Sequence, residues 1–222
     1  NFGACMLPAR QVGGDFYDHF ELPSGKTGIV IADVSGKGVP AALFGMVSKT
    51  LLRSTATQAE RDPSTVIEMV NDALCMDNDT CMFVTVVLAT LDRQTGQLAF
   101  VNAGHPPPLL IHANGETEFL PTTGGMALGV AEGMPFEHLE IQLNPGDRVV
   151  FYTDGVTEAL NPQNAEFTQD RLPPLLGQAM QTDVRETVQK IIHAVDTFAE
   201  GAPQSDDITC LSLYFHGVGR NL

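Results

Sequence analysis

The chain has 222 residues, of which 43% are hydrophobic and 18% are charged, a composition typical of a folded globular protein. Extensive disorder is excluded, because disordered chains combine low hydrophobicity with high charge. Lys and Arg number 12 against 27 Asp and Glu, which gives a net charge of −15. This charge argues against a nucleic-acid or anionic-membrane partner, since both are bound through clustered basic residues. An excess of carboxylates instead suits divalent cations.

The sequence carries no segment that would place this chain in a membrane. No run approaches the roughly 18–20 apolar residues of a membrane span, and no basic segment followed by an apolar run opens the chain as a signal peptide would. We therefore expect a cytoplasmic domain without direct membrane insertion. The chain begins at Asn1 and soon enters a glycine-rich motif, so we expect a catalytic piece of a longer regulatory protein. Membrane tethering of that protein through another segment stays open.

The cysteines show neither a CxxC spacing nor an accompanying histidine pattern; they are Cys5, Cys75, Cys81 and Cys210. This argues against a disulfide scaffold and against a zinc site of the usual spacing. We expect buried thiols at these positions, because free cysteine behaves as a small hydrophobic residue.

One buried strand and two helices are expected in the first third of the chain. The run Thr27–Val34 is continuous, apolar and rich in β-branched residues, which predicts a strand that ends at Asp33. Apolar residues then recur at helical spacing, and we expect them to face the core: Val39, Ala42, Leu43, Met46, Val47 and Leu51. A second helix begins at Pro63 with Asp62 as its N-cap. Its expected inward positions are Val66, Ile67, Val70, Ala73 and Leu74.

The rest of the chain predicts a mostly antiparallel region, then a long helix and a last strand. Short apolar runs separated by turn clusters cover Met82–Leu91, Leu98–Val101, Pro108–Ile111 and Val149–Thr153. The helix is capped by Thr182 or Asp183, and its inward residues are Val184, Val188, Ile191, Ile192, Val195 and Phe198. Ile208–Phe215 forms the last strand. Because the helices come in two blocks, the order favours one layered α+β domain over residues 1–222 rather than a doubly wound parallel sheet.

Carboxylates stand at the ends of several of the apolar strands. They are Asp15, Asp33, Asp154 and the neighbours Asp206 and Asp207. A single Asp beside Gly is usually a turn residue, but a group of carboxylates without Lys or Arg neighbours repels itself unless it is protonated or bridged by cations. Ligation by oxygen alone favours Mg²⁺ or Mn²⁺, whereas zinc calls for His or Cys at defined spacing. The sequence therefore predicts a site for hard divalent cations.

Two cations at such a site point to hydrolysis of a phosphate ester. When they lie about 3.5–4 Å apart, they can bridge one water, lower its pKa and direct it at phosphorus. No GxSxG nucleophile motif is present in the sequence. This chemistry is that of a phosphatase that needs no covalent enzyme intermediate.

Three further features have alternative interpretations. The turn Gly36–Ala41 reads GxGxxA after a strand and resembles a dinucleotide-binding turn, which would indicate an oxidoreductase, but Asp33 would then stand close to the pyrophosphate. His105 is either a loop residue that bonds nearby backbone or a catalytic group. Lys37 is either solvated, or balances the charge of a metal site, or meets a phosphate at the N-terminus of the following helix.

Seven ordered segments resemble the SpoIIE-type branch of the metal-dependent PPM protein phosphatases. They are VGGDFYD (Val12–Asp18), ADVSGKGVPAAL (Ala32–Leu43), FVTVVLATLD (Phe83–Asp92), NAGHPPPLL (Asn102–Leu110), LGV (Leu128–Val130), PGDRVVFYTDGVTEA (Pro145–Ala159) and SDDIT (Ser205–Thr209). Together they span nearly the whole chain, which makes a chance similarity improbable.

The resemblance implies an α+β fold, a four-layer sandwich of two antiparallel sheets flanked by helices, with a binuclear site for two Mn²⁺ or Mg²⁺ ions. The ligands implied by motif are Asp15, Asp33, the backbone carbonyl of Val34, Asp154 and Asp206, with Asp207 as an alternative to Asp206. Asp33 is implied to bridge both ions. Asp33 and Asp154 would act in catalysis through metal-bound water, and we expect Gly36 and Lys37 to contact the substrate.

The sequence departs from eukaryotic relatives of the family at two positions. Those relatives carry a histidine shortly after the bridging aspartate, where this chain has Ser35, so metal-bound water is the default proton donor. They also use an N-terminal arginine for phosphate, whereas Arg10 lies only a few residues before the VGGD motif and is treated as solvated.

The family implies phosphoserine or phosphothreonine substrates on small regulatory proteins of the anti-sigma-factor-antagonist type, in bacterial partner switching. It also implies an upstream sensory domain and control of metal occupancy by the helices around Val39–Thr55 and Pro63–Leu74. A homodimer is left open. The competing hypothesis is a phosphatase-like signalling module that binds a partner without turnover. Because all the expected carboxylates are present, the sequence favours the enzyme.

Overall fold

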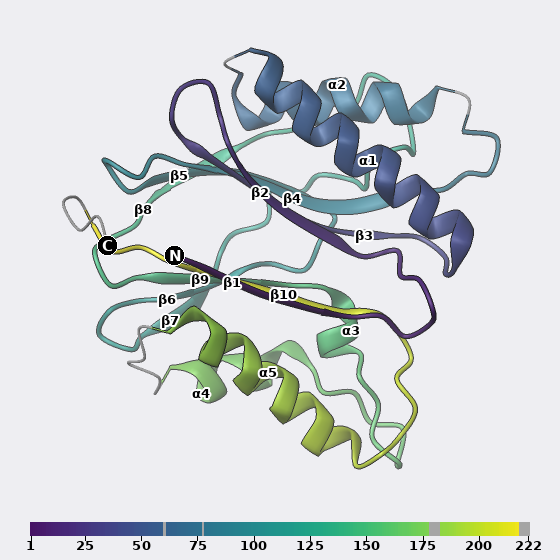
Figure 1. Ribbon diagram of the computed structural model, residues 1–222, viewed down its shortest axis with the longest axis vertical. Coiled ribbons are helices and arrows are strands. Elements are labelled where there is room, and N and C mark those ends of the chain that lie inside the picture. Colours follow the sequence, from purple (N-terminus) through teal and green to yellow (C-terminus); the bar gives the residue numbers. More distant parts are fainter. Residues whose placement is uncertain (60, 77, 178–182, 218–222) are drawn as a thin grey trace. The chain divides into compact units, whose positions relative to one another are not determined.

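The computed structural model describes residues 1–59, 61–76, 78–177 and 183–217. They form two units, each built on one five-stranded antiparallel sheet (Figure 1). Unit 1 comprises Asn1–Ala9, Pro106–Pro121 and Asn144–Leu222, and unit 2 comprises Arg10–His105 and Thr122–Leu143. The predicted α+β class with two antiparallel sheets is confirmed, and every pairing between the named strands is antiparallel.

The sheet of unit 2 has the strand order β2-β3-β4-β5-β8. Its strands are β2 (Phe16–Glu21), β3 (Thr27–Val34), β4 (Val84–Leu91), β5 (Gln97–Ala103) and β8 (Leu139–Gln142). β3 and β4 pair along their full length, from Thr27 opposite Leu91 to Val34 opposite Val84. Both are rich in buried β-branched residues, which suits the middle of a sheet. The predicted strands at 27–34, 82–91 and 98–101 are confirmed, whereas the sequence analysis missed β2 and β8.

Two helices, α1 (Val39–Gln58) and α2 (Pro63–Cys75), lie on one face of this sheet (Figure 1). The cap of α2 is as predicted, because the Asp62 carboxylate accepts the Thr65 N–H at 2.9 Å and Pro63 opens the helix. The predicted inward residues of α2 are buried, apart from the half-buried Ala73. Within the described part of the chain, no helix combines the length and the apolar character needed to cross a bilayer.

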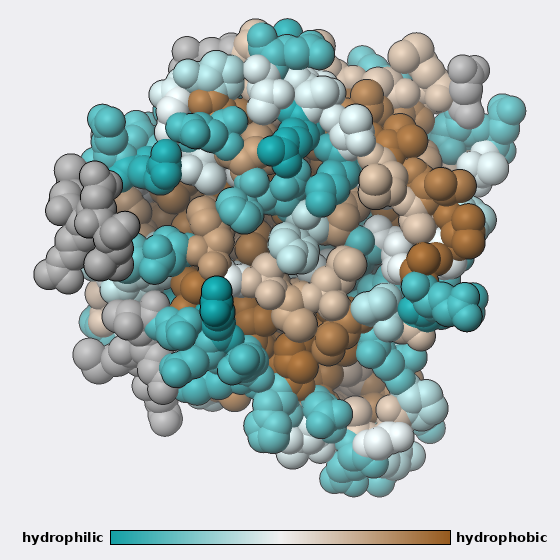
Figure 2. Space-filling model, viewed as in Figure 1, coloured by the Kyte–Doolittle hydropathy of each residue, from teal (hydrophilic) through white to brown (hydrophobic). Residues whose placement is uncertain are grey.

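The predicted core face of α1 is wrong. The buried residues of this helix are mostly small: Ala41, Gly45, Ser48, Leu52 and Ala56. Large apolar residues expected inside are exposed instead, namely Val39 at 62%, Leu43 and Met46 at 63%, and Val47 at 52%. Figure 2 shows hydrophobic atoms at the right of the view, where the first half of α1 lies in Figure 1. The physical reason is a close approach, since a Cβ on Gly45 would lie 3.1 Å from the backbone oxygen of Gly14.

The sheet of unit 1 has the order β1-β10-β9-β6-β7. Its strands are β1 (Phe2–Leu7), β10 (Ile208–Tyr214), β9 (Arg148–Tyr152), β6 (Leu109–Ile111) and β7 (Thr117–Phe119). Its helices are α3 (Asp154–Thr157), the 3-10 turn η1 (Gln169–Arg171), α4 (Leu172–Leu176) and α5 (Val184–Ala199). The strands predicted near 108–111, 149–153 and 208–215 are confirmed, whereas β1 and β7 were not predicted.

Helix α5 packs against β1 and β10 with the face that its periodicity predicts. Its buried residues include Val184, Val188, Ile191 and Val195, while Ile192 and Phe198 are half-buried against the same cluster. Asp183 is the N-cap, since its carboxylate accepts the Arg185 N–H at 2.8 Å. The alternative cap Thr182 lies outside the described residues.

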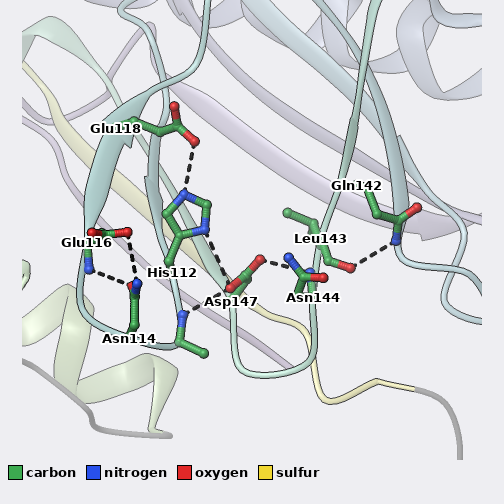
Figure 3. A network of polar contacts seen from close by, with 9 residues as sticks. His112, Asn114, Glu116, Glu118, Gln142, Leu143, Asn144 and Asp147 are labelled. Atoms are coloured by element: carbon green, nitrogen blue, oxygen red, sulfur yellow. Dashed lines mark hydrogen bonds and ion pairs between the residues drawn. The ribbon is translucent and has the colours of Figure 1, made fainter.

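A polar network secures the end of unit 1 at which β9 begins (Figure 3). The buried Asp147 carboxylate accepts the N–H of Ala113 at 3.0 Å and the N–H of Asn144 at 2.8 Å, and it lies 3.8 Å from the His112 ring. Asp147 precedes β9 and Asp154 follows it, so this network holds turns at the end of β9 opposite to the candidate site.

The cysteines differ in exposure. Cys210 is buried, Cys5 and Cys75 are half-buried, and Cys81 is exposed. The expectation of buried thiols is therefore correct only for Cys210. Cys81 closes a turn in which its N–H donates to Asn78 O, and a turn position of this kind lies at the surface.

Candidate functional site

Two of the predicted metal ligands stand at one end of the sheet in unit 2. Phe16 pairs with Ala32 across β2 and β3. Asp15 directly precedes Phe16 and Asp33 directly follows Ala32, so both carboxylates lie at the same end of neighbouring strands. Asp15 is only 6% exposed and Asp33 is half-buried. Acidic groups at the same end of neighbouring strands, in a partly buried place, repel each other, and a bound cation relieves that repulsion.

The backbone around these carboxylates is packed closely against the next predicted ligand. A Cβ added at Gly14 would lie 3.0 Å from the carbonyl oxygen of Val34 and 3.3 Å from the side chain of Ala41. The Gly13-Gly14 turn therefore lets the chain before Asp15 approach both the end of β3 and α1. Larger residues at Gly14 or Gly45 would separate these elements.

A hydrogen-bond network supports Asp33 from the neighbouring strand. Thr85 is the register partner of Asp33 in β4, and its hydroxyl lies 3.5 Å from Asp33 O and 2.9 Å from His105 Nδ1. His105 is 4% exposed and is held by Asn102, whose side chain donates to His105 O and accepts the His105 N–H, both at 2.8 Å. His105 is thus a buried loop residue whose ring contacts a side chain. The sequence analysis did not single out Thr85, although it lies in the FVTVV segment.

The loop after β3 is open and ends at the N-terminus of α1. Gly36 and Gly38 have positive φ values of 86° and 79°, and no atom lies within 4 Å of a Cβ at either position. Lys37 is exposed between them. Ser35 is engaged with Phe83, since its hydroxyl accepts the Phe83 N–H and its N–H donates to Phe83 O, both at 2.9 Å.

In unit 1 the predicted ligands lie on two segments in contact. Asp154 is the first residue of α3, two residues after the end of β9, and Asp207 directly precedes β10. Thr153 joins the segments, because its N–H donates to Thr209 O at 3.0 Å and its hydroxyl accepts the Thr209 N–H at 3.0 Å. A Cβ added at Gly155 would overlap with the Asp207 carbonyl oxygen, so only glycine fits beside Asp154.

The two neighbouring aspartates of unit 1 have different surroundings. Asp207 is buried, and its Oδ1 accepts the N–H of Ala9 at 2.7 Å, which ties the segment after β1 to the start of β10. Asp206 is half-buried, and its Oδ1 accepts the Asp207 N–H at 2.9 Å. The Asp207 carboxylate thus has a structural role in holding the Ala9 N–H, and this difference favours Asp206 over Asp207 as a ligand.

The donor set fits hard cations such as Mg²⁺ and Mn²⁺. Every predicted donor is a carboxylate or carbonyl oxygen, the atoms that these ions prefer. Among the residues that the structure describes, no three His, Cys, Asp or Glu side chains converge to hold a metal ion. Each unit instead presents carboxylates from two segments in contact.

Comparison with known proteins identifies the family. The family model of "Stage II sporulation protein E (SpoIIE)" matches residues 23–216. Protein IcfG of Synechocystis sp. is 30% identical over 240 residues, which cover 95% of this chain and 37% of IcfG. Phosphoserine phosphatase RsbU of Bacillus subtilis is 30% identical over 191 residues, which cover 86% of this chain and 56% of RsbU. The chain thus spans about half or less of these two proteins.

A solved structure agrees with this assignment. The SiaA-PP2C domain of Pseudomonas aeruginosa superposes with a TM-score of 0.85 at 24% identity, over 96% of this chain and 85% of that one. The fold is therefore that of a PP2C phosphatase domain, as the sequence motifs indicated. Because the family model covers most of the sequence, the chain belongs to the SpoIIE family of PP2C-like phosphatase domains.

Proposed function

We propose that residues 1–222 form one catalytic domain, a metal-dependent serine/threonine protein phosphatase. The observation that carries this proposal is the set of partly buried carboxylates at strand ends in both units, in a chain of the SpoIIE family. The relatives RsbU and RsbP are both named phosphoserine phosphatases, which supports the same class of reaction.

The proposed ligands of two Mn²⁺ or Mg²⁺ ions are the oxygen donors that the family motifs imply. They are Asp15, Asp33, the Val34 carbonyl, Asp154 and Asp206, with Asp207 the weaker alternative because its carboxylate holds the Ala9 N–H. When bound, such ions lower the pKa of water and neutralise charge on a phosphate. One structural neighbour, RsbX, was solved in complex with magnesium, at 18% identity and a TM-score of 0.68.

We assign the phosphate group of the substrate to the loop at Gly36 and Lys37. This loop is open, and α1 behind it has neither a side-chain N-cap bond nor an acidic residue in its first turn. Backbone N–H groups at such a helix end favour an anion, and the exposed Lys37 adds a positive charge. Thr85 and His105 have a different role, since their hydrogen bonds hold the end of β3 that carries Asp33 and Val34.

The proposed substrate is a phosphoserine or phosphothreonine on a small regulatory protein of the anti-sigma-factor-antagonist type. This part rests on the family resemblance, as does an upstream sensory domain. The limited share of IcfG and RsbU that the chain covers is compatible with further domains in the full-length protein. The exposed apolar face of α1 is compatible with the proposed control by that helix and with a homodimer.

The decisive experiment measures hydrolysis of p-nitrophenyl phosphate and of a phosphoserine peptide with Mn²⁺, Mg²⁺ or EDTA, beside Mn²⁺ binding by calorimetry. We expect metal-dependent turnover that Asp33→Ala and Asp154→Ala abolish. The matched control is Asp170→Ala, which removes an exposed carboxylate on η1 and should leave activity unchanged.

Two other outcomes would redirect the assignment. A wild-type chain that binds Mn²⁺ but hydrolyses neither substrate would show that activation needs another domain or a partner. A chain that binds no metal at all would contradict the enzyme and favour a module that binds a partner without turnover.

A further inference from the structure

The sheet of unit 1 places two thiols directly opposite each other. Cys5 in β1 is the register partner of Cys210 in β10. Side chains of directly paired residues in antiparallel strands share one face of the sheet. Both cysteines belong to the cluster beneath α5, Cys210 as a buried member and Cys5 as a partly buried neighbour. Nothing in the proposed phosphatase reaction uses either thiol.

The spacing of this pair follows from the hydrogen-bond pattern of the two strands. Asn1 and Tyr214 form two backbone hydrogen bonds with each other: Asn1 N donates to Tyr214 O at 3.0 Å, and Tyr214 N donates to Asn1 O at 2.9 Å. Bonded and non-bonded pairs alternate along antiparallel strands, so Cys5 and Cys210 form a bonded pair with Cα atoms about 5.5 Å apart. A disulfide accepts a Cα separation of about 4.4–6.8 Å. The backbone is therefore already within bridging range.

The Cβ atoms must approach each other further before a bond can form. In paired strands they lie about 4.5–5.5 Å apart, whereas a disulfide needs about 3.5–4.5 Å. β1 is an edge strand of its sheet, with β10 as its sheet neighbour, so it can shift locally. The resulting bridge would be strained, and strained disulfides are the ones that are easily reduced.

A cavity gives small oxidants access to Cys5. It has a volume of about 400 Å³ and is lined by Cys5 from β1, by Val188 and Ile192 from α5, and by the segment from Ala202 to Ser205. Figure 2 shows hydrophobic atoms in the lower half of the view, where β1 and β10 run beside α5 in Figure 1. Cys5 is thus reachable from solvent, while Cys210 lies behind it in the core.

We propose that Cys5 and Cys210 are a site of reversible oxidation to a cross-strand disulfide, with hydrogen peroxide as the oxidant. The Cys5 thiolate attacks one peroxide oxygen, the O–O bond breaks, and Cys5 becomes a sulfenic acid as hydroxide leaves. The Cys210 thiolate then attacks the Cys5 sulfur, and the S–O bond breaks with loss of a second hydroxide. The two thiol protons convert both hydroxides to water, so two thiols are oxidised and one peroxide is reduced to two waters.

The test uses the full chain with Cys75→Ser and Cys81→Ser, which removes the other thiols. In the unsubstituted chain Cys75 would compete only weakly for peroxide, because burial and then the charges of Glu132 and Asp72 raise the pKa of its thiol. The protein is treated with equimolar hydrogen peroxide, blocked with N-ethylmaleimide and digested with trypsin. We expect a cross-link between peptides 1–10 and 191–220 that dithiothreitol removes. Oxidation should raise Tm only slightly, because strain in the bridge offsets the constraint that it places on a long loop of the unfolded chain.

The matched control adds Cys5→Ser, which should lose both the cross-link and the Tm shift while remaining folded. If peroxide leaves both thiols open to N-ethylmaleimide, or converts Cys5 to a sulfinic acid while Cys210 stays a thiol, the pair is a packing feature and the proposal is wrong. A disulfide found only between two chains on a non-reducing gel would also overturn it.

Discussion

Helices α5 and α1 each cover one five-stranded antiparallel sheet, but they bury side chains of different size. Helix α5 buries large residues such as Val188, Ile191 and Val195. Helix α1 buries mainly small ones and exposes Leu43 and Met46. The difference arises because α1 approaches the turn that carries Asp15 so closely that only small residues fit between them. Hydrophobic periodicity therefore located both helices, but it identified the buried face only for α5.

The two units also differ in what fixes the positions of their predicted metal ligands. In unit 2 the positions of Asp15 and Asp33 follow from the register of β2 and β3. In unit 1 the position of Asp154 follows from the contact of Gly155 with the Asp207 carbonyl. A strand register is fixed by many pairs, whereas a single close contact is sensitive to one substitution.

Substitutions of apolar residues in the two helices should differ most in their effect on stability. Ile191→Ala removes a fully buried side chain of α5 and should destabilise the protein by about 2–5 kcal/mol, because it leaves a cavity. Met46→Ala on α1 should change stability by less than about 0.5 kcal/mol, because this side chain is 63% exposed. Urea unfolding of both variants measures the difference. Similar losses would mean that the outer face of α1 is covered in solution.

The next effect contrasts the two glycine turns. Gly155→Ala places a methyl group against the backbone oxygen of Asp207, an overlap that only movement of the chain can relieve. We expect a loss of about 3 kcal/mol, at the upper end for overpacking. Gly14→Ala, with its nearest contact at 3.0 Å, should cost less, about 1 kcal/mol. Equal midpoints for the two variants in urea unfolding would contradict this ranking.

A smaller effect is expected at the support of Asp33. Thr85→Val keeps the shape of the side chain but removes the hydroxyl that contacts His105 and lies near Asp33 O. Loss of one such hydrogen bond costs about 1 kcal/mol, so Mn²⁺ affinity should fall by up to about fivefold and Tm by about 2–4 °C. Thr85→Ser should restore the affinity. Calorimetric titration provides the readout, and an unchanged affinity in Thr85→Val would rule out this positioning role.

The smallest effect concerns the cap of α2. Burial disfavours ionised Asp62, but the N–H and hydroxyl of Thr65 outweigh it and hold the pKa of Asp62 below its ordinary value. Asp62→Ala should destabilise the protein by about 1 kcal/mol at pH 7. Because the folded-state pKa is lowered, this contribution is complete above the unfolded pKa of about 3.9 and is lost as pH falls through the folded value. Asp62→Asn keeps the capping hydrogen bond but cannot ionise. Urea unfolding of the wild type and of Asp62→Asn as pH is lowered therefore measures how much of the stability depends on ionised Asp62.

Four features could be predicted from the amino-acid sequence: the strands at 27–34 and 82–91, the capped helix after Asp62 and the inward face of α5. In each case the signal is local, either an unbroken apolar run, a capping residue or a helical repeat. The sequence also provided the carboxylates at strand ends and the motifs that led to the family. The sequence analysis did not predict short edge strands such as β1 and β8, because their pairing partners are distant in the chain.

Three features could be seen only in the folded chain: the buried face of α1, the hydrogen bond from the Ala9 N–H to Asp207, and the position of Cys5 opposite Cys210. Each of these features depends on two segments far apart in sequence reaching contact distance. Composition and periodicity report the tendency of a residue to be buried, but they do not report which neighbour it meets. That information resides in strand register and in close backbone contacts, which form only when the chain folds.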